Sequence, residues 1–278
     1  MIFKYLGTAA AEGLPALFCS CDVCKEAREK GGKFIRTRSQ AMIDDDFIID
    51  FNADSYMHFL RYGIDGGKIR HCLITHNHSD HFYPEDLVMR MDDFAHLEDE
   101  KSVLTVYGSE IIGETMSYQL FKDRNFHTLA FQRLKLFQPF QAENYKITPL
   151  TAIHSPDTGA FIYLIEKNNK TILYAHDTHF LDESVWKYLE ENKIHIDLAS
   201  LDCTSANVPE MTYIGHMNLN DNIRVKERLL KIGSADEKTI FVCNHFSHNG
   251  LDVSYDKFKA LAEKYGLLTS YDGMEIEL

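Results

Sequence analysis

The sequence predicts an α/β fold, and three observations carry that prediction. Short apolar runs rich in β-favouring residues alternate with segments of helical spacing. The chain has 278 residues, of which 45% are hydrophobic, so it can bury a sizeable core. Histidine and aspartate residues follow directly on several apolar runs, where a rigid sheet would hold loop side chains in fixed positions. We therefore expect one domain over residues 1–278, with its chemistry at the strand ends.

The elements follow from periodicity and from punctuating residues. The strands that we expect are 1–7, 39–43, 47–50, 69–74, 102–107, 145–153, 158–165, 171–175, 196–201 and 239–243. The helices that we expect are 25–30, 54–62, 84–89, 110–121, 182–192, 218–232 and 254–265. Pro84 suits a first helical position, and Asn52, Ser109 and Asn218 are expected as N-caps. Residues 123–141 have no clean period, and we expect an insertion that shapes the pocket.

Charge and hydropathy narrow the function classes. The net charge of −13 argues against a nucleic-acid binder, because phosphate contacts need clustered Lys and Arg. It is compatible with a small anionic substrate, since bound metal ions create their own positive field. No apolar run approaches the ~20 residues that cross a bilayer, and the first residues lack a signal-peptide layout. We therefore expect a cytoplasmic protein with no membrane partner.

The segment Thr75-His76-Asn77-His78-Ser79-Asp80-His81 is the strongest motif. In an extended chain, side chains two apart share a side, so His76 and His78 can bind one ion. Asp80 and His81 can reach a second ion once the chain turns. Imidazole and carboxylate suit Zn, Mn or Fe, and two adjacent ions favour hydrolysis of esters or phosphoesters. The alternative is three surface histidines that cluster by chance.

The cysteines form a second motif. Cys19, Cys21 and Cys24 lie within six positions, and three thiolates can occupy three corners of a tetrahedral zinc site. The alternatives are three free thiols, or one disulfide with one thiol left over. The isolated cysteines are expected to be small buried hydrophobic side chains, at positions Cys72, Cys203 and Cys243.

The pattern Thr-His-x-His-x-Asp-His after an apolar strand resembles the signature of the metallo-β-lactamase superfamily of metal-dependent hydrolases. The resemblance implies a four-layer αββα sandwich with the metals at one edge of its two sheets. It implies His154 as third histidine of the first ion, Asp177 as bridging carboxylate and His245 as ligand of the second ion. The implied sets are His76, His78 and His154 on one ion, Asp80, His81 and His245 on the other, and Asp177 on both.

Further residues carry a narrower resemblance. Cys-x-Cys-x-x-Cys near the N-terminus with a late His245-x-x-His248 resembles the PhnP-like phosphoribosyl cyclic phosphodiesterase branch and, in part, the PqqB-like branch. His248 would then be the fourth ligand of one structural zinc. His216 resembles a superfamily histidine that contacts the substrate phosphate, and it is a candidate acid. The alternative for His216 is a histidine that begins a helix and bonds to the backbone.

The remaining site residues have supporting roles in the resemblance. Asp50 would support the metal loop from behind, and Asp80 would serve catalysis as well as binding an ion. His176 and His179 fit no ligand position, and we expect them behind the ligands or at the surface.

The function that these features predict is a dinuclear metal-dependent hydrolase, a phosphodiesterase acting on a small or cyclic phosphodiester through a hydroxide between the two ions. A lactonase-type ester hydrolase is one alternative. A PqqB-like protein of cofactor biosynthesis, which does not hydrolyse its substrate, is the other. The sequence leaves open whether the protein is a homodimer.

Overall fold

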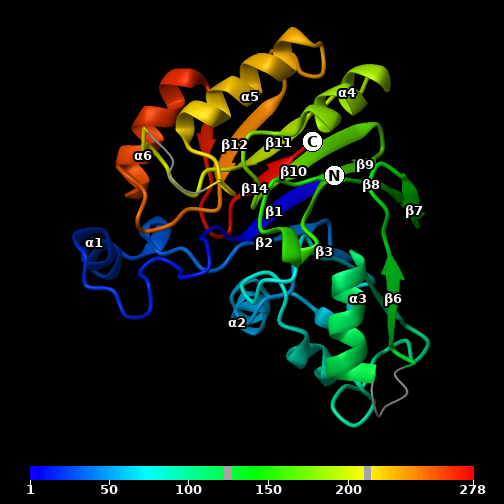
Figure 1. Cartoon of the computed structure of the whole chain (residues 1–278). Coiled ribbons are helices and arrows are strands. Elements are labelled where there is room, and N and C mark those ends of the chain that lie inside the picture. The colour runs from blue at the N-terminus through cyan, green and yellow to red at the C-terminus, as the bar shows by residue number, and fades with distance from the viewer. Residues whose placement is uncertain (122–126, 210–213) are drawn as a thin grey trace.

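The computed structural model describes residues 1–121, 127–209 and 214–278, and these form two mixed sheets packed face to face (Figure 1). The first sheet has the spatial order β14 (Glu275–Glu277), β1 (Ile2–Gly7), β2 (Gln40–Ile43), β3 (Phe47–Ile49), β4 (His71–Leu73), β5 (Leu104–Gly108), β6 (Leu129–Arg133). The second has the order β13 (Leu268–Thr269), β12 (Ile240–Asn244), β11 (Leu198–Asp202), β10 (Lys170–Ala175), β9 (Phe161–Lys167), β8 (Tyr145–Thr151), β7 (Phe140–Ala142).

Helices cover the outer face of each sheet. Figure 1 shows α4 (Glu183–Glu191), α5 (Leu219–Lys231) and α6 (Tyr255–Ala262) on one side, and α2 (Ser55–Tyr62) and α3 (Glu110–Met116) on the other. The remaining α-helix of the described chain, α1 (Asp22–Lys30), follows the cysteine motif. This arrangement confirms the predicted αββα sandwich.

The alternation of side chains along each strand explains the layers. In β10, Ile172 and Tyr174 pack between the two sheets, while Leu173 and Ala175 pack under the outer helices. Successive strand residues point to opposite faces, so a strand covered on both sides is apolar throughout. Trp186 of α4 is one of the large side chains that fill the outer layer, and it is 1% exposed.

Strand direction brings the predicted site residues to one edge. β3 to β6 run parallel to one another, and so do β10, β11 and β12. β8 pairs antiparallel with β9, which pairs antiparallel with β10, so β8 ends at the same edge as β10. The carboxyl ends of β8, β10, β11 and β12 therefore lie together, and the loop after β4 meets them from the other sheet.

Two helical predictions differ from the structure. Residues Pro84–Arg90 form a 3₁₀ helix, and the buried side chains are Pro84, Leu87 and Arg90. Their spacing of three matches the three-residue turn of that helix, so an α-helix would turn one of them away from the core. The segment predicted as a helix over 110–121 is α-helical only as far as Met116, and residues Ser117–Phe121 form a π-helix.

Of the three predicted N-caps, Asn218 is confirmed in full, Ser109 in position only, and Asn52 is wrong. Asn218 is confirmed, because its side chain accepts a hydrogen bond from the amide of Asp221. Asn52 lies outside its helix and instead accepts from the amide of Asp54, which occupies the N-cap position. Ser109 stands at the N-cap of α3, but its buried hydroxyl bonds to nothing within the described ranges.

The sequence missed four strands, all at or beside sheet edges. β6 and the first two residues of β7 lie in the stretch 123–141 that was expected to be an insertion, of which residues 123–126 fall outside the described chain. β13 and β14 lie in the C-terminal tail. Edge strands are short and pair on one side only, so their sequences need no continuous apolar run. Within the described residues, no helix combines the length and apolar character that a membrane crossing requires.

His58 of α2 makes acid stability testable. The ring is buried, with Nδ1 2.6 Å from the Gln40 side-chain oxygen and Nε2 2.7 Å from the Thr37 hydroxyl. Burial lowers the pKa of His58 to about 4, against 6.5 for an ordinary histidine. The unfolded chain therefore binds a proton as the pH falls below 6.5, while the folded chain resists it until about pH 4. The stability from neutral His58 is complete above pH 6.5 and is lost toward pH 4.

We expect His58→Gln to flatten this pH dependence. Between pH 7 and pH 4.5, the free energy of unfolding of the native protein should fall by roughly 2 to 3 kcal/mol more than that of the variant. Urea unfolding at the two pH values measures the difference. An equal loss in both proteins would show that His58 stays neutral in the unfolded chain or is protonated in the folded one.

Candidate metal centre

Asp50 holds the histidine-rich loop in place. It follows directly on β3, and its Oδ1 accepts hydrogen bonds from the amide and hydroxyl of Thr75 at 2.8 and 2.9 Å. Its Oδ2 lies 2.7 Å from Nδ1 of His81. The resemblance implied this supporting role, and the contacts agree with it. Because Nδ1 of His81 donates to Asp50, Nε2 is the nitrogen of that ring that remains for a ligand in the interior of the site.

Three other imidazoles have the same arrangement. Nδ1 of His76 donates to the Thr75 hydroxyl at 3.1 Å, and Nδ1 of His154 donates to the Gly215 carbonyl at 3.1 Å. The Thr204 hydroxyl lies 2.8 Å from Nδ1 of His245. Each outer nitrogen thus has a partner outside the cluster, and each Nε2 is directed inward, where its lone pair could bind a metal ion.

The first inward-facing group consists of His76, His78 and His154. Nδ1 of His78 lies 2.8 Å from Nε2 of His76 and 3.2 Å from Nε2 of His154. One ligand atom from each residue lies within 4.8 Å of the other two. Burial lowers the pKa of His76 well below its ordinary value and also lowers the pKa of His154, which favours their neutral, lone-pair-donating form.

The second group consists of Asp80, His81 and His245. Nε2 of His81 lies 3.2 Å from Nε2 of His245 and 3.3 Å from Oδ2 of Asp80. Burial opposes a positive charge on the His81 ring. Nevertheless the carboxylates of Asp177, Asp80 and Asp50 raise the pKa of His81 well above its ordinary value. The three carboxylates around His81 therefore strongly favour a positive charge at that ring or next to it.

Asp177 joins the two groups. Its Oδ2 lies 2.8 Å from Nε2 of His81 and 2.9 Å from Nε2 of His245, and its Oδ1 lies 3.7 Å from Nε2 of His154. Although these contacts are short, Oδ2 is buried and has no partner with hydrogen-bond geometry among the described residues. A buried carboxylate oxygen surrounded by inward-facing lone pairs needs a cation. The donor set therefore fits divalent ions that accept nitrogen and oxygen ligands.

Asp202 is a site residue that the sequence analysis missed. It ends β11, is fully buried, and accepts hydrogen bonds from the amides of Asp177 at 3.0 Å and Met217 at 2.9 Å. Its Oδ2 lies 3.0 Å from Nδ1 of His216, and that nitrogen lies 3.6 Å from Oδ1 of Asp177. The available signal was an aspartate at the end of an apolar strand, the pattern that had identified Asp50.

His216 therefore lies beside the cluster, next to two carboxylates. Burial lowers the pKa of its imidazole, but Asp202 outweighs that effect and raises the pKa to about 9. The alternative for His216 was a histidine that begins a helix and bonds to the backbone. The main-chain carbonyl of His216 does accept a 2.8 Å hydrogen bond from Nδ1 of His179, but its imidazole lies against the Asp202 carboxylate. His176 is buried, with Nε2 2.7 Å from the Ser200 hydroxyl, so the surface alternative for His176 is wrong.

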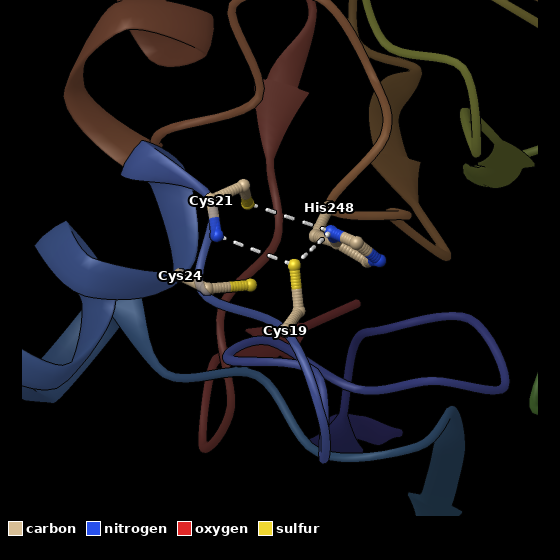
Figure 2. Close-up of side chains that lie close together, drawn as sticks. All are labelled: Cys19, Cys21, Cys24 and His248. Atoms are coloured by element: carbon tan, nitrogen blue, oxygen red, sulfur yellow. Dashed lines mark hydrogen bonds between the residues drawn. The ribbon is translucent and has the colours of Figure 1, made fainter.

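The cysteine motif forms a separate cluster with His248. Figure 2 shows Cys19, Cys21, Cys24 and His248 pointing toward one another, with their ligand atoms all within 4.8 Å. Nδ1 of His248 lies 3.6 Å from Sγ of Cys19 and 3.7 Å from Sγ of Cys21. All six cysteines are free, so the disulfide alternative is not what the structure contains. Cys72, Cys203 and Cys243 are buried as predicted.

The environment of the thiols differs across this cluster. Burial opposes ionisation of Cys21, but the amide of Cys24 and the ring of His248 outweigh it and lower the pKa of Cys21 to about 6. Burial raises the pKa of Cys24 to about 11. The amide of Ala16 donates to Sγ of Cys24 at 3.3 Å, and the amide of Cys21 donates to Sγ of Cys19 at 3.4 Å. Such amides stabilise thiolates, which are the zinc-binding form of cysteine.

Comparisons with known proteins agree with this geometry. A model of the β-lactamase superfamily domain matches residues 53–235, which is more than half of the chain. A search of curated proteins finds no match. Among solved structures, a diphosphatase of the PhnP family superposes with a TM-score of 0.77 at 18% identity, over 100% of this chain and 97% of that one.

Two further structures share the fold. Zinc-bound PqqB from Methylobacterium extorquens has a TM-score of 0.72 at 16% identity, with both chains covered at 100%. The metallo-β-lactamase fold protein YhfI from Bacillus subtilis has a TM-score of 0.71 at 18% identity, over 100% of this chain and 99% of that one. The family model covers more than half of the chain, and the histidines and aspartates follow the strands in the predicted order. The chain therefore belongs to the β-lactamase superfamily, has the metallo-β-lactamase fold, and resembles the PhnP branch.

Proposed function

We propose that the protein is a dinuclear metal-dependent hydrolase that cleaves a small phosphodiester. The observation that carries the proposal is Asp177, whose two oxygens face the two groups of inward-pointing nitrogens. A fold whose members are mostly metal-dependent hydrolases supports the reaction class. The structural neighbour from the PhnP family is a diphosphatase. Its activity favours a phosphate ester over a carboxylic ester as the substrate proposed for this protein.

In this proposal each group of side chains holds one divalent ion. His76, His78 and His154 would bind the first, Asp80, His81 and His245 the second, and Asp177 both. Zn, Mn and Fe all accept this donor set. When bound, two such metal ions would act as Lewis acids toward the phosphoryl oxygens and would activate water near neutral pH. The outer contacts of Asp50, Thr204 and the Gly215 carbonyl would fix the tautomers of the ligands.

His216 would contact the substrate phosphate and protonate the leaving oxygen. Its ring lies 3.6 Å from Asp177 and its side chain is 18% exposed, so it borders the cluster and is still reachable by a ligand. Asp202 would position that ring, because it holds Nδ1 at 3.0 Å and accepts the amide of the next residue, Met217. The protein carries a net charge of −13, so attraction of an anion must come from this local site.

The third proposed ion is a structural zinc on Cys19, Cys21, Cys24 and His248. His248 lies three residues beyond His245, so a zinc there would fix the N-terminal loop to the chain that leaves β12. Binding energy at such a site adds to the stability of the folded chain.

A substrate panel combined with metal analysis tests the proposal. The panel contains bis-p-nitrophenyl phosphate, a five-membered cyclic phosphodiester, a diphosphate ester and a lactone. We expect two metal equivalents beyond the cysteine site and the highest kcat/KM on a phosphodiester. Lactone hydrolysis without diester cleavage would replace the proposal with a lactonase. Tight iron binding with oxygen uptake and no hydrolysis would favour a PqqB-like role.

The loss of activity on substitution of His216 should depend on the leaving group of the substrate. We expect His216→Ala to lower kcat/KM by roughly 10² to 10⁴-fold on a diester with an alkoxide leaving group, since general acid catalysis is worth about that much. The loss should be much smaller with p-nitrophenolate, which leaves without protonation. Equal losses on the two substrates would contradict an acid role. Unchanged kcat/KM on both would remove His216 from the site altogether.

A further inference from the structure

Glu12 lies between the two segments that form the cysteine–histidine cluster. It stands in the loop after β1, and its Oε1 accepts a hydrogen bond from the hydroxyl of Ser247. The same oxygen lies 3.7 Å from Nε2 of His248. A carboxylate from the start of the chain therefore contacts both residues that follow Phe246 near its end.

The ring of His248 has one nitrogen toward the sulfurs and one toward Glu12. Nδ1 lies within 3.7 Å of Sγ of Cys19 and Cys21, and Figure 2 shows the second ring nitrogen on the side away from the sulfurs. A histidine that binds a metal through one nitrogen must carry its proton on the other. The proton on Nε2 then needs an electronegative neighbour, and Oε1 of Glu12 lies 3.7 Å from that nitrogen, a distance that a small movement of either side chain shortens to a hydrogen bond.

We infer that Glu12 is the positioning residue of the cysteine–histidine zinc site, holding His248 in the tautomer and orientation that present Nδ1 to the ion. The inference rests on the zinc site proposed above. Carboxylates behind a ligating histidine raise its basicity and fix its ring, and their loss typically costs 10 to 100-fold in metal affinity.

Glu12 is itself held in place by contacts to fixed backbone. Ser247 is 8% exposed, its amide donates to the Thr204 carbonyl at 3.1 Å, and its hydroxyl accepts from the amide of Asn249 at 3.1 Å. The amide of Ala10, two residues before Glu12, donates to the Phe246 carbonyl at 3.0 Å. These contacts hold the loop that carries Glu12 against the chain that carries Ser247 and His248.

The cluster also tolerates the additional negative charge. Three thiolates and one zinc ion carry a net charge of −1, and Glu12 makes the local charge −2. The guanidinium of Arg28 in α1 donates to the carbonyls of Cys19 at 2.8 Å and Ala16 at 3.3 Å. Its positive charge offsets part of this excess.

Zinc release from the full-length protein tests the inference. The rate of transfer of the cysteine-site zinc to a chromogenic chelator is compared in the native protein, Glu12→Gln and Glu12→Asp. We expect Glu12→Gln to accelerate release by roughly 10 to 100-fold, because the amide keeps the bond from Ser247 but loses the charge. Glu12→Asp should restore part of the difference. Glu29→Gln, an exposed change on α1 beside the cluster, is the control and should release zinc at the native rate.

A cobalt-substituted protein gives a second readout that general destabilisation does not change. Co²⁺ at this site should show thiolate charge-transfer bands in every variant, with ligand-field bands that shift in Glu12→Gln and not in Glu29→Gln. Native release rates and native bands in Glu12→Gln would overturn the role of Glu12 and leave the zinc site standing. Absence of these bands and of a third metal equivalent in the native protein would overturn the zinc site itself.

Discussion

Asp177→Asn is expected to reduce kcat/KM on the phosphodiester substrate by about 10³-fold or more, which corresponds to about 4 kcal/mol of transition-state stabilisation. Asp177 is the residue whose carboxylate faces both groups of inward-pointing nitrogens. An asparagine has nearly the same shape but offers one neutral oxygen, so it cannot balance two divalent ions. Steady-state kinetics and metal analysis of the same preparation measure both consequences.

Asp157→Asn is the matched control, because Asp157 is an exposed aspartate in the loop that follows His154. It should keep native kinetics and native metal content. The assignment of Asp177 would be wrong if Asp177→Asn kept both metal equivalents and native kcat/KM. Loss of activity with full metal occupancy would make Asp177 a substrate contact instead of a shared ligand.

Cys24→Ser should produce the largest loss of stability. Cys24 is fully buried and its sulfur accepts the amide of Ala16, so it would be the innermost zinc ligand. A ligand present at 1,000 times its Kd stabilises the folded state by about 4 kcal/mol. Loss of the zinc should therefore lower the Tm by about 8 °C or more for a chain of this size. Differential scanning calorimetry with metal analysis measures the shift and the missing equivalent.

Cys72→Ala separates zinc loss from cavity formation, since Cys72 is equally buried but lies in β4, away from the cluster. This variant should lose some stability and keep its full metal content. Native zinc content in Cys24→Ser would show that the site does not need that thiolate. If Cys24→Ser and Cys72→Ala lowered the Tm equally and both retained zinc, the loss of stability would come from altered packing.

The order of elements was predictable because strands buried on both faces must be apolar throughout. Thr171–Ala175 and Thr239–Cys243 in the sequence become β10 and β12 with small changes at their ends. The edge strands β6 and β7 were not predictable, because among the described residues each pairs along one edge only, and such strands tolerate polar side chains such as Gln132 and Gln141. The 3₁₀ helix over Pro84–Arg90 was missed because a proline at the first position and acidic residues in the first turn suit an α-helix equally well.

The candidate site was predictable where a metal-binding type of residue directly follows a predicted strand. His76, His78, His154 and His245 each follow an apolar strand, and parallel strands bring such ends to one edge. Asp202 also ends a strand, but the resemblance to the family gave it no role. Glu12 carries no signal at all, because a loop glutamate becomes significant only through its neighbours in space.

The sequence by itself therefore determined the α/β class and which side chains could bind metal, because both depend on local periodicity and on the chemistry of single residues. The αββα order of the layers was an expectation from the family resemblance. Only the tertiary structure decided which nitrogen of each ring faces inward, that Asp202 holds His216, and that Glu12 faces His248. Those facts depend on contacts such as the one between Glu12 and Ser247, which are 235 positions apart. No local pattern records such a pairing, because it exists only once both sheets have packed.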